Sequence, residues 1–246
     1  MKRLLWLLIS APLALAQPSD PEALLGKVSS TYELITQYHV DVNASLLESV
    51  ASWRESLASS GSGRYRYESQ TPGFTVVYVS DGHSSWAYRP ELRQYTEDAP
   101  GTDRSRRAQE TASKVETMLL TRFRMLSKVP KEARILRQED VQVDVMPGNK
   151  KGRKVRCLVL DIKPTGGEHW TEQLWIDPDR ALVLKSIFVE PARPPFLPSR
   201  SVLRVWNRLE IGPPDDSVFH FTPPRGARLV KYVDIPQPIN PAVNPP

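Results

Sequence analysis

Cysteine and histidine are scarce in this chain, and their scarcity excludes two classes of protein. A single cysteine, Cys157, among 246 residues leaves no partner for an intramolecular disulfide and no set of thiolates for a zinc site. The four histidines are scattered, and no two have the spacing of metal ligands on a helix or hairpin: His39, His83, His169 and His220. We therefore expect neither a bound metal nor a cofactor.

Catalytic motifs are also missing. The chain has no Gly-x-Ser-x-Gly nucleophile elbow. Its acidic residues mostly occupy turns such as Asp177-Pro178-Asp179 and Asp215-Asp216, where they initiate the turn. Glu168-His169 is the one adjacent acid–histidine pair, and adjacent residues on a strand point to opposite faces. We expect a protein without catalysis and assign no catalytic residue.

Charge of one sign is not in large excess, since 33 Lys and Arg stand against 28 Asp and Glu, a net charge of +5. Two basic clusters, residues 104–107 and 150–156, could contact phosphate or an anionic membrane surface. The second follows Pro147-Gly148-Asn149, which is typical of a hairpin tip with solvated cations. Neither has a helix-turn-helix pattern or an aromatic ribonucleoprotein motif, so we expect no nucleic-acid partner.

The N-terminal residues have the pattern of a secretory signal. Lys2-Arg3 precede an apolar run over residues 4–15, and Ala14-Leu15-Ala16 places small residues before a cut at Gln17. The apolar run contains Pro12 and is shorter than the roughly 20 residues that a membrane-spanning helix needs. The prediction is a signal peptide of residues 1–16, cleaved after Ala16, and an exported protein.

Beyond this segment the hydrophobic periodicity predicts a mainly β (α+β) protein. Apolar residues three and four apart predict a helix from Pro21 to about residue 35 and a second over residues 106–127, ended by Pro130. Residues 46–60 are ambiguous, because Trp53 and Leu57 have helical spacing but no clear cap follows. Alternation of period two predicts strands at residues 38–43, 63–67, 74–79, 84–88, 92–96, 134–145, 154–163, 170–176, 182–190, 202–211, 218–221 and 227–233.

Several of these strands are too apolar to have one face in water. Residues 156–160 and 182–188 are largely apolar at both parities, and two helices cannot cover both faces of about eleven strands. One solution is a sheet that curls around a concave apolar lining, with the helices plugging its mouth. A barrel or sandwich with a packed interior fits the periodicity equally well.

Two motifs resemble those of the LolA-like periplasmic lipoprotein carriers. Residues 77–95 (VYVSDGHSSWAYRPELRQY) are similar to the signature hairpin of that family, and residues 219–227 (FHFTPPRGA) to its closing motif. The resemblance implies an incomplete antiparallel β-barrel of about eleven strands in residues 17–235, with helices plugging the concave face. The signal peptide of residues 1–16 would precede this domain, and a Pro-rich flexible tail, residues 236–246, would follow it.

The resemblance also implies a function. The protein would be a non-catalytic periplasmic carrier that binds the acyl chains of lipoproteins or other lipids in a hydrophobic cavity, between an inner-membrane donor and an outer-membrane acceptor protein. The alternative is a periplasmic regulatory or scaffold module of the same fold that senses lipoproteins by protein–protein contacts. Carriers of the family have an Arg-Pro pair whose arginine bonds to the lid. Residues 64–72 lack that pair, so Arg64 and Arg66 are the candidates for the lid latch.

The hairpin predicts the residues that line the cavity. Asp81-Gly82 is the strongest turn signal in the sequence, and a two-residue turn there sets Val77 opposite Trp86 and Thr75 opposite Tyr88. We assign the lining to one face of this hairpin: Val77, Val79, Trp86 and Tyr88. The other parity fits nearly as well: Phe74, Val76 and Tyr78. From the second helix we assign lid residues, although such a stripe is more often plain core: Val115, Leu119 and Phe123.

Overall fold

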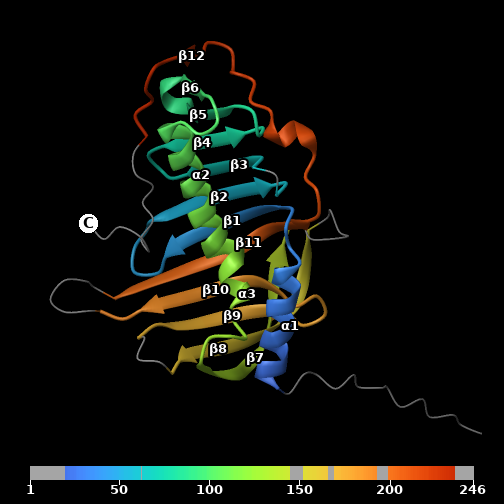
Figure 1. Ribbon diagram of the computed structural model, residues 1–246. Helices are drawn as coiled ribbons and strands as arrows, with labels where there is room; N and C mark the ends of the chain where they lie inside the picture. Colours follow the sequence, from blue (N-terminus) through green and yellow to red (C-terminus); the bar gives the residue numbers. More distant parts are fainter. Residues whose placement is uncertain (1–19, 62, 145–151, 166–168, 193–198, 236–246) are drawn as a thin grey trace, which may run out of the picture.

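A computed structural model describes residues 20–61, 63–144, 152–165, 169–192 and 199–235 (Figure 1). The predicted signal peptide of residues 1–16, the tail of residues 236–246 and part of the second basic cluster lie outside these ranges. The helical elements are α1 (Pro21–Glu33), η1 (Pro90–Leu92), α2 (Asp103–Glu116), the π-helical turn η2 (Thr117–Thr121), α3 (Arg122–Arg124) and η3 (Asp216–Phe219). No helix within the described ranges is long and apolar enough to cross a bilayer.

The strands form one sheet. They are β1 (Tyr38–Leu46), β2 (Ser52–Ser59), β3 (Tyr65–Gln70), β4 (Thr75–Ser80), β5 (Ser85–Arg89), β6 (Gln94–Asp98), β7 (Lys131–Val143), β8 (Arg153–Pro164), β9 (Thr171–Asp177), β10 (Leu182–Glu190), β11 (Arg200–Ile211) and β12 (Arg228–Leu229). Their order is β12-β6-β5-β4-β3-β2-β1-β11-β10-β9-β8-β7, and every pairing is antiparallel except that of β12 with β6. The pairing of β1 with β11 joins strands β1 to β6 to strands β7 to β11 in one sheet.

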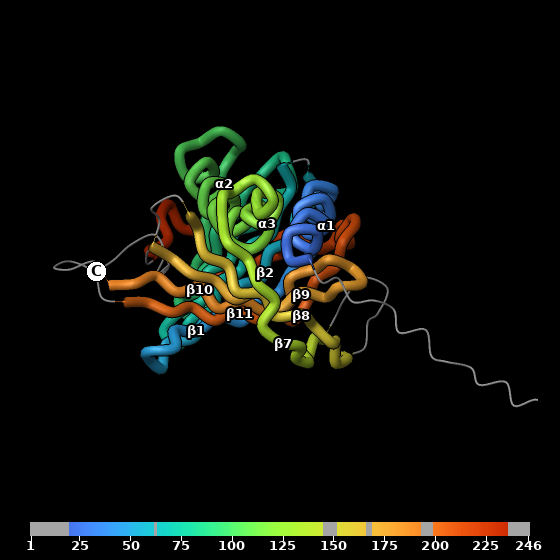
Figure 2. The backbone as a smooth tube through the Cα atoms, turned by 90° about the horizontal axis from the view of Figure 1, so that it is seen from below, coloured from blue at the N-terminus to red at the C-terminus, as the bar shows by residue number. Residues whose placement is uncertain are grey.

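The sheet stays open and curls around the helices. Its edge strands, β7 and β12, are not paired with each other among the described residues. Figure 2 shows α1, α2 and α3 on one side of the curved strands, and α2 crosses the strands in Figure 1. We call the side that carries the helices the inner face and the other side the outer face. The predicted incomplete barrel with helices on its concave face is confirmed.

The helix ends follow from local sequence. Pro21 opens α1 behind the cap Asp20, whose carboxylate accepts the Glu22 N–H at 2.9 Å. Thr102 caps α2 by accepting the Ser105 N–H, so this helix begins three residues before the predicted start at residue 106. The predicted single helix over residues 106–127 is instead α2, the π-helical turn η2 and the short α3.

Three stretches differ from the prediction. The ambiguous residues 46–60 hold the end of β1, a turn and β2; Trp53 and Leu57 share a strand face because their spacing of four is also even. Residues 218–221 are not a strand, because Asp215 caps the 3-10 turn η3 by accepting the Ser217 N–H. Residues 227–233 contribute only the short β12.

Large side chains fill the space between the inner face and α3. Phe123 makes an edge contact with Tyr32 of α1 at 5.0 Å between ring centroids, and it packs on Trp206 of β11 at 5.6 Å. All three residues are completely buried. We call α2, η2 and α3 together the lid. Its C-terminal end is therefore fixed in a closely packed core.

Candidate binding site between α2 and the sheet

The N-terminal part of the lid contacts the sheet through small side chains. Helix α2 lies against β2, β3 and β5, and its buried residues are Ala108, Ala112 and Val115. An alanine reaches only one methyl group beyond the backbone, so the helix seals the inner face poorly on either side of this stripe. A cavity lies on each side of α2.

The first cavity lies between α2 and strands β4 to β6 and has a volume of about 190 Å³. Its inner-face wall includes Tyr78, Ala87 and Thr96, and Ala108 lines it from the helix. The C-terminal segment closes the side beyond β6, where its strand β12 runs beside β6 at the sheet edge (Figure 1). Arg104 holds this corner: it pairs with Asp98 at 2.7 Å and donates to the Lys231 carbonyl.

The second cavity lies on the other side of α2, over β1 to β3, and has a volume of about 350 Å³. Tyr38, Leu57 and Tyr65 form its inner-face wall, and Ala112 and Glu116 line it from the helix. Burial raises the pKa of Tyr38 and of Tyr65, so both phenols stay neutral at physiological pH. Aromatic rings with neutral hydroxyls make this wall amphipathic rather than purely apolar.

A group of buried charged residues lies on the inner face where the lid changes from α2 to η2 and α3. Arg122 pairs with Glu172 of β9 at 2.8 Å and donates to Ser186 of β10 at 3.2 Å. Arg204 of β11 is 4% exposed and points its Nη2 at the Met118 sulfur, 3.9 Å away. Burial, together with the nearby Arg122, lowers the pKa of Arg204 to about 10.

Glu55 of β2 completes this group, which we call the inner charge cluster: Glu55, Met118, Arg122, Glu172, Ser186 and Arg204. Glu55 is 5% exposed, and one of its oxygens accepts the Tyr67 hydroxyl at 3.4 Å. Its Oε2 has no hydrogen-bond partner in the described part of the chain. Burial raises the pKa of Glu55, because the ionised form loses its hydration.

The three predicted lid residues pack in the core and line neither of the two cavities. Val115, Leu119 and Phe123 face the sheet, and none is more than 4% exposed. They belong to one core cluster with Leu57 and Tyr67 of the inner face. Their contact with a lipid stays a prediction.

The prediction of a two-residue turn at Asp81-Gly82 is wrong. Residues 81–84 connect the strands, because Asp81 Oδ1 accepts the N–H groups of both His83 and Ser84 at 2.7 Å. The pairing is therefore Val77 with Tyr88 and Val79 with Trp86, two residues from the predicted register. A shift of two preserves the face, so the four predicted residues still lie on one side of the sheet.

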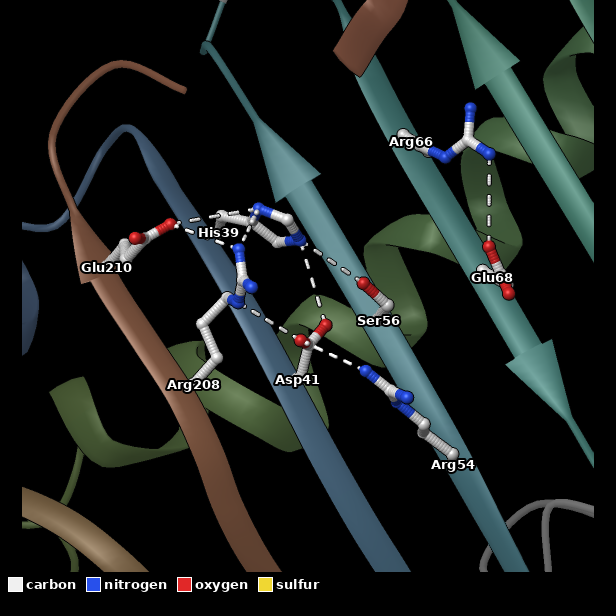
Figure 3. A network of polar contacts seen from close by, with 8 residues as sticks. All are labelled: His39, Asp41, Arg54, Ser56, Arg66, Glu68, Arg208 and Glu210. Atoms are coloured by element: carbon white, nitrogen blue, oxygen red, sulfur yellow. Dashed lines mark hydrogen bonds and ion pairs between the residues drawn. The ribbon is translucent and has the colours of Figure 1, made fainter. Parts of the chain in front are cut away.

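That side is the outer face. Val77 and Val79 lie opposite Glu68 and Arg66 of β3, whereas the alternate residues, Tyr78 and Tyr67, stack at 6.2 Å and pack with the inner core. Arg66 and Glu68 lie on the outer face with α2 behind the sheet in Figure 3. The rival parity containing Val76 and Tyr78 is thus the inner one. Of the four predicted residues, only Trp86 borders one of the two cavities.

On the outer face the predicted lining has its own cover. Phe221 of the C-terminal segment packs over three rings of β5 and β6, at 6.0 Å from Trp86 and 5.6 Å from Tyr88 and Tyr95. The FHFTPP motif therefore supplies an aromatic plug for the outside of the sheet. The sequence pattern could not show this, because both parities of the hairpin are apolar.

Around Asp41 and His39 the outer face is polar. Asp41 of β1 is 6% exposed and pairs with Arg208 at 3.1 Å and Arg54 at 3.2 Å (Figure 3). His39 contacts Ser56 at 3.3 Å, and burial lowers the pKa of its imidazole. Such a ladder of cross-strand pairs suits a solvated sheet face.

Neither latch candidate is bonded to the lid in the described residues. Arg64 pairs with Asp216 at 2.7 Å, and its guanidinium lies 4.7 Å over the Phe219 ring, so it holds η3 to the sheet. Arg66 faces outward and lies 3.8 Å from Glu68. The arginines that hold the lid come from the lid itself: Arg122, and Arg124, which donates to the Tyr32 and Ile35 carbonyls.

Sequence reasoning missed the inner charge cluster, although a signal was present. Glu55 lies on the same face of β2 as Trp53 and Leu57, two residues from each. Arg204 lies in the same way on the face of β11 that carries Val202 and Trp206. A charged residue at an apolar parity of a strand indicates a buried charge, and buried charges gather at functional sites. The signal becomes specific only after the strand faces are assigned.

Comparisons with known proteins give the family. Similar solved structures include MucB in the Pseudomonas aeruginosa MucA/MucB complex (14% identity, 82% of this chain and 61% of that chain, TM-score 0.40) and LprF from Mycobacterium bovis (9%, 81% and 98%, 0.48). A LolA superfamily protein from Nitrosomonas europaea is also similar (9%, 82% and 97%, 0.27). The chain spans less than two thirds of MucB. A comparison with curated proteins gave no match. The model of a family described as "Predicted periplasmic protein (DUF2092)" matches residues 28–233, so the chain belongs to that family.

Proposed function

We propose that this protein is a non-catalytic periplasmic carrier that binds the acyl chains of lipoproteins or other lipids between α2 and the inner face. The observation that carries the proposal is the contact of α2 with the sheet through Ala108 and Ala112, with a cavity on each side. The apolar contact of α2 with the sheet is small, and the cation of its Arg104–Asp98 ion pair is half-exposed, so a ligand that buries more apolar surface can displace the helix.

The energies favour such an exchange. Two alanine methyls and a valine side chain contribute a few kcal/mol of burial, at about 0.8 kcal/mol per carbon. An acyl chain that buries about a dozen methylenes gains on the order of 10 kcal/mol. The surplus would suffice for capture, and partial burial of the chain would keep release possible.

The lid has a natural place to bend. Leu119, Leu120 and Phe123 are completely buried and hold its C-terminal end, whereas α2 is held more weakly. Leu119 and Leu120 belong to the π-helical turn η2, so the bend falls where α2 meets η2, and such turns are frequent at functional sites. We expect α2 to move away from β4 to β6 about this turn while α3 stays in place.

The inner face offers a suitable floor. Tyr65, Tyr67 and Tyr78 lie side by side on β3 and β4, and burial raises the pKa of Tyr78 to about 12. Neutral phenol rings present apolar faces to a hydrocarbon chain. The chain would lie across these rings, in the space that the two cavities open.

The test fills the first cavity from the helix. Ala108→Trp should reduce uptake of tritiated palmitate by the purified mature protein at least tenfold, because the indole occupies the space the chain needs. Glu110→Trp, on the exposed side of the same helix, is the matched control and should bind as the wild type does. Equal uptake by the two variants would contradict binding beneath α2, and no uptake by the wild type would contradict the carrier function.

A second candidate is the scaffold module that senses lipoproteins by protein contacts. The turn between β1 and β2 exposes Leu47 and Val50, at 52% and 101%, and an open groove of about 510 Å³ lies beside it. Exposed apolar side chains beside a groove are typical of protein contacts. For the carrier, this turn would face the donor or acceptor protein. The double variant Leu47→Ser/Val50→Ser should then lose capture of a partner protein but keep palmitate binding. That result would assign the turn to protein contacts and the space under α2 to lipid.

A further inference from the structure

Arg204 is a buried cation without a paired anion. It is 4% exposed, and among the described residues its side chain has one hydrogen-bond contact, from Nη2 to the Met118 sulfur. Its Nε has no partner. A thioether is a weak acceptor and carries no charge, so this contact does not replace the hydration that burial removed.

The charges around Arg204 do not compensate it. Glu172 forms an ion pair of 2.8 Å with Arg122, so the carboxylate of Glu172 already has a charged partner. Glu55 is close enough to act on Arg204 through space but forms no ion pair within 4.0 Å in the described chain. Burial also raises the pKa of Glu55, which favours its neutral form. The guanidinium of Arg204 is therefore a buried charge with no direct ion pair in the described chain.

We infer that Arg204 anchors the anionic head group of the acyl ligand, a carboxylate or a phosphate, when the lid opens. The inference rests on the proposed function and names its ligand class: an anionic amphiphile rather than a neutral one. The planar guanidinium matches the two oxygens of such a group and forms stronger bonds to it than to a neutral acceptor.

The position of Arg204 suits this role. Met118, which covers it, belongs to the π-helical turn η2, so bending of the lid there uncovers the guanidinium first. Arg204 lies opposite Ala44 of β1, two residues along that strand from Val42, which faces Glu55 of β2. An acyl chain over the tyrosines of β3 and β4 could therefore place its head group at β11, with Arg122 as a second donor.

The test compares two ligands that differ only in the head group. Mature wild-type protein should retain tritiated palmitate at least tenfold more tightly than tritiated hexadecanol in equilibrium binding, which corresponds to about 1.4 kcal/mol. Arg204→Gln should bring this ratio close to one by weakening palmitate binding alone, and Arg204→Lys should give an intermediate ratio. Arg208→Gln, on the same strand but the outer face, is the matched control and should keep the wild-type ratio.

Each negative outcome of this experiment would overturn a different statement. A wild-type ratio near one, or an unchanged ratio in Arg204→Gln, would overturn the anchor while the carrier proposal stands. If Arg204→Gln did not fold, a wild-type ratio in Arg204→Lys would overturn it in the same way. Absence of binding to both ligands would overturn the carrier proposal itself. Stabilisation of the wild type by inorganic phosphate alone, to the same melting temperature as by palmitate, would assign Arg204 to a free anion and overturn the acyl head group.

Discussion

Arg122 and Glu172 form an ion pair of 2.8 Å between the lid and strand β9, and Glu172 is almost completely buried. This pair lies at the end of the lid opposite to the alanine contacts of α2. Close packing of large buried side chains holds the end with Arg122, whereas α2 contacts the sheet through a few methyl groups and the Arg104–Asp98 ion pair, whose cation is half-exposed. From this difference we expect α2 to be the end of the lid that moves.

Breaking this pair should destabilise the whole protein. Arg122→Gln leaves Glu172 buried without its partner, and we expect a loss of about 3 kcal/mol in the free energy of unfolding. Urea denaturation measures it. The double variant Arg122→Gln/Glu172→Gln should lose less than the sum of the two single variants, because it leaves no unpaired charge. Additive losses would show that the two side chains do not interact.

The hydrogen bonds of Ser29 give a second prediction about the fixed end. Its hydroxyl donates to the Phe123 carbonyl at 3.2 Å and accepts the Ser127 N–H at 2.9 Å, so α1 closes the end of the lid. Ser29→Ala should cost about 2 kcal/mol in unfolding free energy, since two buried backbone groups lose a partner. The neighbour Ser30 is exposed, and Ser30→Ala should change stability by less than about 0.5 kcal/mol.

The fold was more predictable than the site, and particular residues show why. Strand β10 was predicted with its observed bounds, because Leu182 to Glu190 lies between clear turn signals. The faces of the β4–β5 hairpin were not predictable, since Val76 and Val77 are both apolar and both buried. Which of them faces the helices depends on the pairing of β4 with β3, a tertiary property that no local pattern carries.

The inner charge cluster was out of reach for a similar reason. Arg204 and Glu55 are far apart in sequence, and they share a face only because β1 pairs with both β2 and β11. The latch was sought at Arg64 and Arg66 from the family resemblance, whereas the arginines that fix the lid lie within it. Arg122 follows directly after the π-helical turn, whose extra residue sets the direction of the side chain and has no signature in the periodicity.

Glu55 should give stability a measurable pH dependence. Burial raises its pKa above the ordinary 4.5, so the folded protein binds the proton more tightly than the unfolded chain does. The contribution of this carboxyl to stability is complete below the ordinary pKa and is lost as the pH rises through the folded value. Glu55→Gln removes that loss, so the stability of the variant relative to wild type should rise between pH 4 and pH 7 in urea unfolding.

Glu139 is the control of opposite sign. Burial acts to raise its pKa, but hydrogen bonds from Trp175, Lys185 and Arg137 outweigh burial and lower the pKa. Its contribution to stability is present above the ordinary pKa and lost as the pH falls, so Glu139→Gln should become less stable relative to wild type as the pH rises. Parallel pH profiles for the two variants would contradict the assignment of Glu55 to a buried site.

Phe221 tests which face of the hairpin is the outside. Its ring packs on Trp86, Tyr88 and Tyr95, so Phe221→Ala should expose these rings, shift the emission of Trp86 to longer wavelength and cost about 2 kcal/mol in stability. Palmitate should shift the emission of Trp86, which borders the first cavity, and that of Trp206, which packs on Phe123 of the lid. Single-tryptophan variants separate the two signals. Loss of the Trp86 response to palmitate in Phe221→Ala would return the ligand to the outer face, the face first predicted from the sequence.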